Sequence, residues 1–201
     1  MALINLKTPI EEAQVRKLHI GDHITISGTI FTARDEAHLR ALQFARDNRP
    51  LPFATQGNVL YHCGPVARQI DSGWEVLSAG PTTSTRLEKF EAEFIKSFGI
   101  TVIIGKGGML EQTQEALKEY GAVYCNFTGG AGVIAANFIE KVEQVIWLDL
   151  GIPEAVWVFK VKEFGPLLVA IDTYKNSIFD NVQKHVVARK DILLKELEAD
   201  K

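Results

Sequence analysis

The stretch ITVIIGKGGMLEQTQEALKEYGAVYCNF, residues 100–127, decides the fold. It contains an apolar run at Ile100–Ile104, an amphipathic helical pattern at Glu111–Tyr120 and a second apolar run at Ala122–Phe127. Gly121 stands where helices often end in a left-handed residue, a conformation that glycine adopts without strain. Short apolar runs that alternate with amphipathic helices are typical of parallel sheets built from strand–helix–strand units. The stretch therefore predicts an α/β fold.

The same alternation continues on both sides of this stretch. It predicts further strands of the parallel sheet at Trp74–Ala79 and Val142–Leu148, and helices at Arg86–Phe98 and Val133–Glu140. Two later runs, Val156–Val161 and Leu167–Asp172, are separated only by a short Lys-Glu-Phe-Gly-Pro turn. Because so short a connection cannot cross over, we expect these two runs to pair antiparallel or to lie at an edge.

The remaining segments complete a mixed α/β domain whose central sheet is partly parallel. We expect strands at His23–Phe31 and Val59–His62, and helices at Glu36–Ala45 and Val182–Leu197. There is no internal repeat, and Asp47–Pro52 is the only segment that resembles a linker. A single domain over residues 1–201 is therefore expected.

Composition excludes several classes of function. The 201 residues are 46% hydrophobic, with 25 acidic against 22 basic side chains and a net charge of -3, so a nucleic acid is not expected as the main partner. Apolar runs are far shorter than the roughly 20 residues that cross a membrane, and the amino terminus lacks a signal-peptide pattern. We expect a soluble, cytoplasmic protein.

Two cysteines, Cys63 and Cys125, limit the metal chemistry of this chain. Structural zinc sites and iron–sulfur clusters take three or four ligands, and neither cysteine has a CxxC neighbour or a spaced histidine pair nearby. We therefore expect two buried free thiols and no metal bound by this chain alone. A disulfide is compatible with the spacing, although cytosolic proteins seldom use one.

Three glycine-rich loops follow predicted strands, at Ser78–Arg86, Gly105–Met109 and Asn126–Gly132. The carboxyl ends of strands are where α/β sheets bind ligands, and each loop leads into a helix whose first N–H groups favour an anion. Two loops also carry a cation, Arg86 and Lys106. The pattern predicts a site for a small dianion, although it contains neither GxxxxGK[ST] nor GxGxxG.

Local structure offers an alternative explanation for the first loop. Gly80-Pro81 could form a turn, and Thr85 with Glu88 could form a capping box, which would account for the hydroxyl groups without a ligand.

A further candidate is the segment Phe31–His38, which leaves a strand and enters a helix. Arg34 and His38 would share one helical face, with Asp35 near the helix start, although a solvated amphipathic helix explains the same pattern. His62 beside Cys63 suggests a nucleophile, but adjacent residues of a strand point to opposite faces. We therefore exclude that pair.

The loops hold hydroxyls, amides and cations but no strong base and no Lewis acid. Such groups bind and polarise a dianion without completing a reaction. The residues taken alone therefore predict half of an active site.

At these loops the sequence resembles the beta subunit, or carboxy-terminal domain, of class I iron–sulfur fumarate hydratases and the similar L-tartrate dehydratases. The shared blocks extend over nearly the whole chain: Gly21-Asp22, Ser27-Gly-Thr29, Ala33-Arg-Asp-Glu-Ala-His38, Tyr61-His-Cys-Gly-Pro65, Ser78-Ala-Gly-Pro-Thr-Thr-Ser84 with Arg86, Ile104-Gly-Lys-Gly-Gly-Met109, Gly129-Gly130, Glu154-Ala-Val-Trp157 and Phe164-Gly-Pro166. The GPTTS-x-R and GKGGM blocks are the most specific.

The resemblance implies a swivelling β/β/α domain in three layers that completes the active site of a hydro-lyase. A separate alpha subunit would hold a [4Fe-4S] cluster, with none bound by this chain alone, in an assembly such as alpha2beta2. The reaction would be the hydration of fumarate to L-malate, with L-tartrate dehydration as the alternative within the family. A non-catalytic anion-binding or assembly module is the alternative of another class.

The resemblance also implies roles for particular residues. Arg34, Arg86 and Lys106 would bind the dicarboxylate, and Thr82 would transfer the proton. Further residues expected at the site are Thr83 and Gly107, which would bind substrate, and Asp35 and His38, which would support it.

Overall fold

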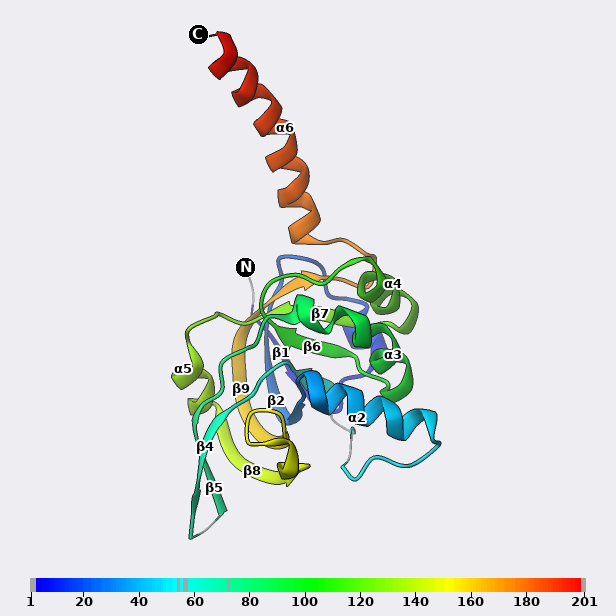
Figure 1. The fold of residues 1–201 in the computed structure, drawn as a ribbon, viewed down its shortest axis with the longest axis vertical. Helices are drawn as coiled ribbons and strands as arrows, with labels where there is room; N and C mark the ends of the chain where they lie inside the picture. The colour runs from blue at the N-terminus through cyan, green and yellow to red at the C-terminus, as the bar shows by residue number, and fades with distance from the viewer. Residues whose placement is uncertain (1–2, 54, 56–57, 72, 200–201) are drawn as a thin grey trace.

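The computed structural model describes residues 3–199 except 54, 56–57 and 72. Its central sheet has the strand order β1-β2-β3-β6-β7-β9-β8, and β2 also pairs with β9. Five strands therefore close into a ring, while β1 flanks β2 and β8 flanks β9 (Figure 1). The strands are β1 (Leu3–Lys7), β2 (His23–Thr32), β3 (Val59–Tyr61), β6 (Val102–Gly105), β7 (Val123–Asn126), β8 (Ile139–Ile146) and β9 (Val156–Ile171).

The stretch at residues 100–127 folds as predicted. β6 and β7 pair in parallel, and α4 (Glu111–Tyr120) connects them. Gly121 closes α4 with a φ of 68°. β1, β2, β3, β6 and β7 are all mutually parallel along the sheet, which confirms a mixed α/β fold with a mostly parallel centre.

Two predicted parallel strands are wrong in their pairing. The run at Trp74–Ala79 forms β5 (Gly73–Ser78), which pairs antiparallel with β4 (Val66–Ile70) in a separate two-stranded sheet. The run at Val142–Leu148 lies in β8, which pairs antiparallel with β9. β4 and β8 are partly exposed along their length, whereas the parallel strands β3 and β6 are buried throughout. This difference in burial distinguishes the two kinds of strand.

The prediction of two short strands near the carboxy terminus is also wrong. Val156–Val161 and Leu167–Ile171 belong to one 16-residue strand, β9, which ends one residue before Asp172. β9 pairs with β2, β7 and β8 and is therefore not at an edge. Its pairing with β2 shifts register on both sides of Ile26, the partner of Phe164. Irregular pairing of this kind bends a strand without ending it and accommodates Pro166, which has no N–H to donate.

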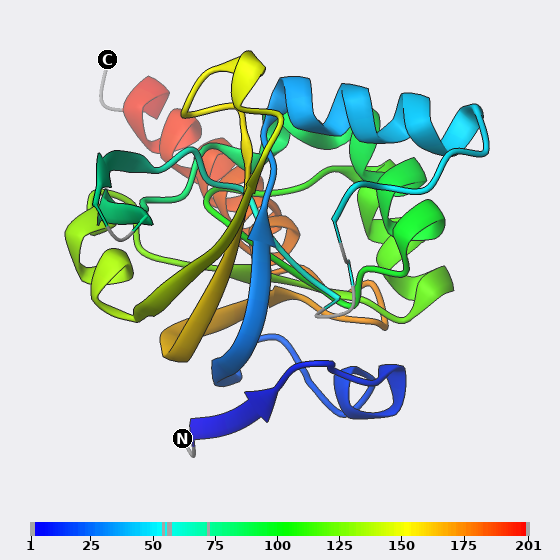
Figure 2. The same cartoon turned by 90° about the horizontal axis from the view of Figure 1, so that it is seen from below.

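Helices cover the ring on two sides. α2 packs on α3 and α3 on α4, while the short α5 contacts β5 and β8 (Figure 1). α6 extends away from the rest of the molecule, and in Figure 2 β1 and α1 lie together beyond one end of the ring. The helices are α1 (Glu12–Val15), α2 (Asp35–Arg46), α3 (Glu88–Phe98), α5 (Gly132–Asn137) and α6 (Ile178–Ala199), with 3-10 turns η1 (Ser84–Leu87) and η2 (Leu148–Leu150).

The predicted helices differ from the observed ones mainly at their ends. The helix predicted at Arg86–Phe98 begins as η1 and ends at Gly99, whose φ is 62°. The one predicted at Val133–Glu140 ends at Asn137, because Ile139 already belongs to β8. In the described ranges, no helix combines the length and the apolar composition needed to cross a membrane.

The apolar core has two parts, one inside the ring and one between the ring and α2, α3 and α4. Neighbouring residues of β6 alternate between them: Val102 and Ile104 lie in the first part and Ile103 in the second. Both faces of such a strand are buried, which explains why the parallel strands are continuously apolar in sequence.

Candidate functional site

The three glycine-rich loops meet at one end of the ring. The N–H of Ser84 donates to the carbonyl of Lys106 at 3.0 Å, and the N–H of Phe127 donates to the carbonyl of Gly105 at 2.9 Å. The N–H of Ala79 donates to the carbonyl of Gly132, also at 2.9 Å. The first loop follows a hairpin strand, not a parallel one, yet these backbone hydrogen bonds place it beside the other two.

Arg34 and Asp35 lie at the same end, where β2 leads into α2. A guanidinium nitrogen of Arg34, Nη2, lies 3.2 Å from Oε1 of Glu154, and 23% of the Arg34 side chain is exposed. Asp35 forms an ion pair with Arg86, whose side chain is 49% exposed. The structure therefore brings Arg86 next to the segment that carries Arg34, and half of the Arg86 side chain is accessible to a ligand.

Lys106 lies between the first and third loops. Thr83 and Lys106 form an isolated parallel bridge, and a methyl group added to Gly129 would lie 3.4 Å from Cδ of Lys106. Gly107 has a φ of 73°, the left-handed region that glycine favours, and is exposed. Thr82 is half-buried, and its N–H donates to the carbonyl of His62 at 2.7 Å.

The predicted capping box is not formed. The hydroxyl of Thr85 donates to the carbonyl of Gly108 at 2.7 Å. The Glu88 carboxylate accepts hydrogen bonds from the N–H groups of Leu110 and Thr113, at 2.7 and 3.0 Å, and so caps α4. The hydroxyl groups of the first loop are therefore not explained by capping of their own helix.

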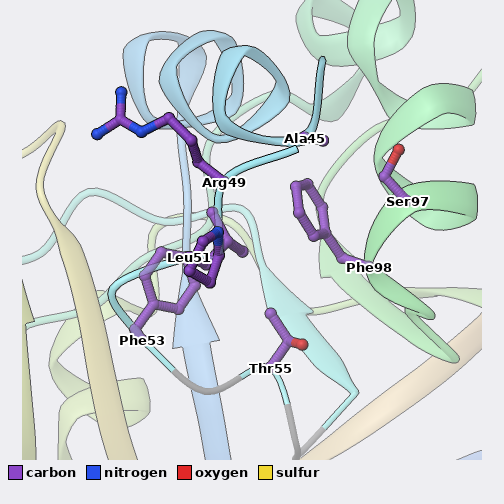
Figure 3. Close-up of a pocket in the computed structure, with 8 residues that line it drawn as sticks. Ala45, Arg49, Leu51, Phe53, Thr55, Ser97 and Phe98 are labelled. Carbon is purple, nitrogen blue, oxygen red and sulfur yellow. The ribbon is translucent and has the colours of Figure 1, made fainter. Parts of the chain in front are cut away.

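A cavity of about 470 Å³ adjoins Arg86, and its lining includes Thr85, Glu88 and Leu110. Lys106 is not among its lining residues, so this cavity does not join the two cations. A larger cavity, of about 670 Å³, lies at the opposite end of the parallel strands, among residues that precede β3 and β6 (Figure 3). A common pocket for Arg86 and Lys106 stays a prediction.

A fully buried polar cluster lies beneath the first loop and was not predicted. Nε2 of His62 lies 3.1 Å, and Nε2 of His38 3.4 Å, from Oε2 of Glu91. Nδ1 of His62 lies 2.9 Å from the hydroxyl of Ser84, and Nδ1 of His38 lies 2.7 Å from the carbonyl of Arg34. The reading of Phe31–His38 as the start of a solvated helix face is therefore wrong for His38.

Burial and the charges of neighbouring groups act in opposite directions on the ionisation of this cluster. Burial lowers the pKa of His62, and the charge of Glu91 opposes that shift only in part. For Glu91 burial acts in the opposite direction, but the two imidazoles outweigh it and lower the pKa of the carboxyl to about 2. Glu91 is therefore a carboxylate that depends on positive charge within the cluster.

Both cysteines are free and fully buried, as expected, and burial raises the pKa of each thiol. Cys63 packs in the core inside the ring, whereas the adjacent His62 turns toward α3. This opposite orientation confirms that the two do not form a nucleophilic pair.

Comparison with known proteins identifies the family. The family model "Fumarase C-terminus" matches residues 1–182. The chain is 40% identical over 192 residues to the L(+)-tartrate dehydratase subunit beta of Escherichia coli strain K12, which covers 96% of this chain and 94% of that protein. It is 41% identical to the "Putative L(+)-tartrate dehydratase subunit beta" of Methanocaldococcus jannaschii, over 92% of this chain and 95% of that protein.

A relative of different organisation matches as well. Over 183 residues the chain is 44% identical to the "Putative fumarate hydratase class I" of Geobacillus stearothermophilus, which covers 90% of this chain but 34% of that longer protein. The family model and the relatives that match from end to end agree with the resemblance found in the sequence blocks. The chain belongs to the Fumarase C-terminus family.

Proposed function

We propose that this chain is the beta subunit of a hydro-lyase that acts on a four-carbon dicarboxylate, with fumarate and L-malate as substrate and product. One observation carries the proposal: Arg34, Arg86 and Lys106 lie on segments that meet at one end of the ring. Membership of the family and the names of the relatives support the reaction class.

The cations supply binding and orientation. A guanidinium binds a carboxylate through two hydrogen bonds, whereas an ammonium acts as a point charge. In the free chain Arg86 is paired with Asp35, so a substrate carboxylate would replace the Asp35 carboxylate. Arg34 and Lys106 would hold the rest of the dianion, with Thr83 and Gly107 beside it.

Thr82 is the group that we assign to proton transfer. An alcohol is a very weak base at neutral pH, so its alkoxide needs nearby positive charge in a site closed to water. Lys106 and Arg86 are the cations on neighbouring segments that could supply that charge. The hydrogen bond from the Thr82 N–H to the His62 carbonyl holds the backbone of this residue in place.

The iron–sulfur cluster implied by the resemblance does not fit this chain. Its only two cysteines are fully buried in the core, whereas such a cluster takes at least three ligands that reach it. We therefore propose that a partner alpha subunit holds the cluster. On this proposal the chain is active only in a hetero-oligomer, such as alpha2beta2, in the cytoplasm.

The test is reconstitution with the purified alpha subunit under anaerobic conditions. Activity should appear only in the mixture. Thr82→Ala should abolish turnover with little change in dicarboxylate affinity, and Thr82→Ser should restore part of it. Retention of near-normal turnover in Thr82→Ala would remove the proton-transfer role.

A second variant tests binding. Arg86→Lys keeps the charge but loses the two-point contact, so KM should rise. The matched control is Arg40→Lys, because Arg40 pairs with Asp149 on the surface and not with a loop of the site. An unchanged KM and rate in Arg86→Lys would contradict the assigned contact.

L-Tartrate is the second candidate substrate. The relatives that match over 94–95% of their own length are named L(+)-tartrate dehydratase beta subunits. Fumarate, L-malate and both tartrates should therefore be compared in the reconstituted pair. Absence of activity with all of these diacids would favour a non-catalytic anion-binding module.

A further inference from the structure

The buried cluster of His38, His62 and Glu91 joins three elements that are distant in sequence. His38 comes from α2, His62 follows β3 directly, and Glu91 comes from α3, which packs beside α2 (Figure 1). All three side chains have no exposed surface. One potential ligand atom from each lies within 4.8 Å of those of the others.

The hydrogen bond on the outer side of the His38 ring decides which of its nitrogens faces Glu91 without a hydrogen. The carbonyl of Arg34 can only accept, so the 2.7 Å contact places the hydrogen of the His38 ring on Nδ1. In the neutral ring, Nε2 then presents a lone pair toward the Glu91 carboxylate. Nδ1 of His62 bonds the hydroxyl of Ser84, a group that donates or accepts, so this contact does not fix which nitrogen of His62 carries the hydrogen. The His38 lone pair and the Glu91 carboxylate are two electron-rich groups that face one another, and a cation between them would stabilise both.

The separations in the cluster are long for charge-assisted hydrogen bonds and are compatible with metal coordination. Charge-assisted hydrogen bonds between nitrogen and a carboxylate measure about 2.7–2.9 Å, whereas the two separations here are 3.1 and 3.4 Å. Nε2 of both histidines and both carboxylate oxygens of Glu91 are buried without a hydrogen-bond partner. Ligands bound to tetrahedral zinc at about 2.0–2.1 Å stand roughly 3.3 Å apart.

We propose that His38, His62 and Glu91 bind a divalent transition-metal ion of the Zn²⁺ class. Two imidazole nitrogens and one carboxylate form a donor set that suits zinc, and the unpartnered second oxygen of Glu91 would make the carboxylate bidentate and the four-coordinate site distorted from a regular tetrahedron. The Arg34 carbonyl and the Ser84 hydroxyl, which bond the outer ring nitrogens, are the partners that metal-bound histidines usually have.

The ion would have a structural role. It would tie α2 and α3 to the end of β3, and through Ser84 it would steady the loop at residues 78–86. Because every ligand is buried, the ion would be taken up during folding and exchange slowly. This inference does not depend on the proposed function, since it concerns metal content and not turnover.

The experiment measures metal in the full chain. The protein is produced in minimal medium supplemented with Zn²⁺ or with Co²⁺, then dialysed against EDTA while folded. We expect about one ion per chain to remain, to be released only when the chain is unfolded in the presence of EDTA. The Co²⁺ form should show the visible d–d bands of a four-coordinate site.

Variants locate the ion. Glu91→Gln keeps the shape but removes the charge and should lower the retained metal at least tenfold, whereas His185→Asn, an exposed histidine of α6, should retain the wild-type amount. Wild-type protein that retains no metal in either medium would overturn the proposal and leave a proton as the bridging cation. Equal retention by folded Glu91→Gln, checked by circular dichroism, would also overturn it.

Discussion

Replacement of Gly64 by alanine tests how tightly the segment after β3 is packed. A methyl group there would overlap the carbonyl oxygen of Pro153 and lie 2.7 Å from Cδ and 2.8 Å from Nη1 of Arg34. Carbon atoms in contact are about 3.5–4.0 Å apart, so the neighbours must retreat by roughly 1 Å. The φ of Gly64 lies outside the left-handed region, so backbone strain does not contribute.

The expected loss of stability of Gly64→Ala follows from the cost of overpacking. Forcing a methyl group into a packed site costs about 1–3 kcal/mol, whereas alanine in an open position would stabilise the chain by about 0.4–1 kcal/mol through the unfolded state. For a chain of this size the expected decrease in Tm is roughly 2–12 °C. The displaced Arg34 should also lose its contact with Glu154, so substrate affinity in the reconstituted pair should fall.

Thermal unfolding followed by circular dichroism is the assay. Gly129→Ala is the matched control, because the only neighbour of its added methyl group is the flexible Lys106 side chain, 3.4 Å away. The control should not fall below the wild-type Tm and should exceed it by up to about 4 °C through the unfolded state. A Gly64→Ala variant as stable as wild type would refute the described packing of Gly64 against Pro153 and Arg34.

Three further predictions concern the interior. In the folded protein, Cys63 and Cys125 should not react with iodoacetamide at pH 8, whereas both should react in guanidinium. Rapid labelling of either thiol in the folded chain would contradict its burial. Burial raises the pKa of both thiols above their ordinary value of 9.0. As the pH rises, the thiols of the unfolded chain therefore lose their protons before those of the folded chain. The free energy of unfolding should fall as the pH rises above about 9. Trp157→Ala should cost about 3–5 kcal/mol in urea denaturation, and a cost below 1 kcal/mol would contradict its full burial.

Local patterns predicted the parts of the fold whose partners are close in sequence. β6, α4 and β7 follow one another within residues 100–127, and each strand is apolar because both of its faces are buried. The pairings of β5 and β8 and the continuity of β9 were mispredicted because an apolar run does not encode its partner. The Gly165-Pro166 pair indicates a turn by composition, yet β9 continues across these two residues because it pairs with β2 on both sides of them.

The candidate site likewise has features that the sequence predicts and features that it does not predict. The meeting of the second and third glycine-rich loops was predictable, since loops that follow parallel strands end at one edge of the sheet. The first loop follows the antiparallel strand β5, and only the tertiary structure places it beside them. The ion pair of Arg86 with Asp35 was not, because the residues are 51 positions apart and only the packing of α3 beside α2 brings them together. The catalytic roles of Thr82, Arg86 and Lys106 stay predictions.

The sequence alone determined the α/β class, the glycine-rich loops with their cations, the buried thiols and the family, because each of these depends on the spacing or the composition of nearby residues. Tertiary structure alone decided the closure of the ring through β2 and β9 and the burial of Glu91 between two histidines. In the sequence pattern of its amphipathic helix, Glu91 cannot be distinguished from a solvent-exposed acidic residue. It is buried because α2 and α3 pack over the end of β3, and contacts between such distant segments leave no periodic signal in the chain.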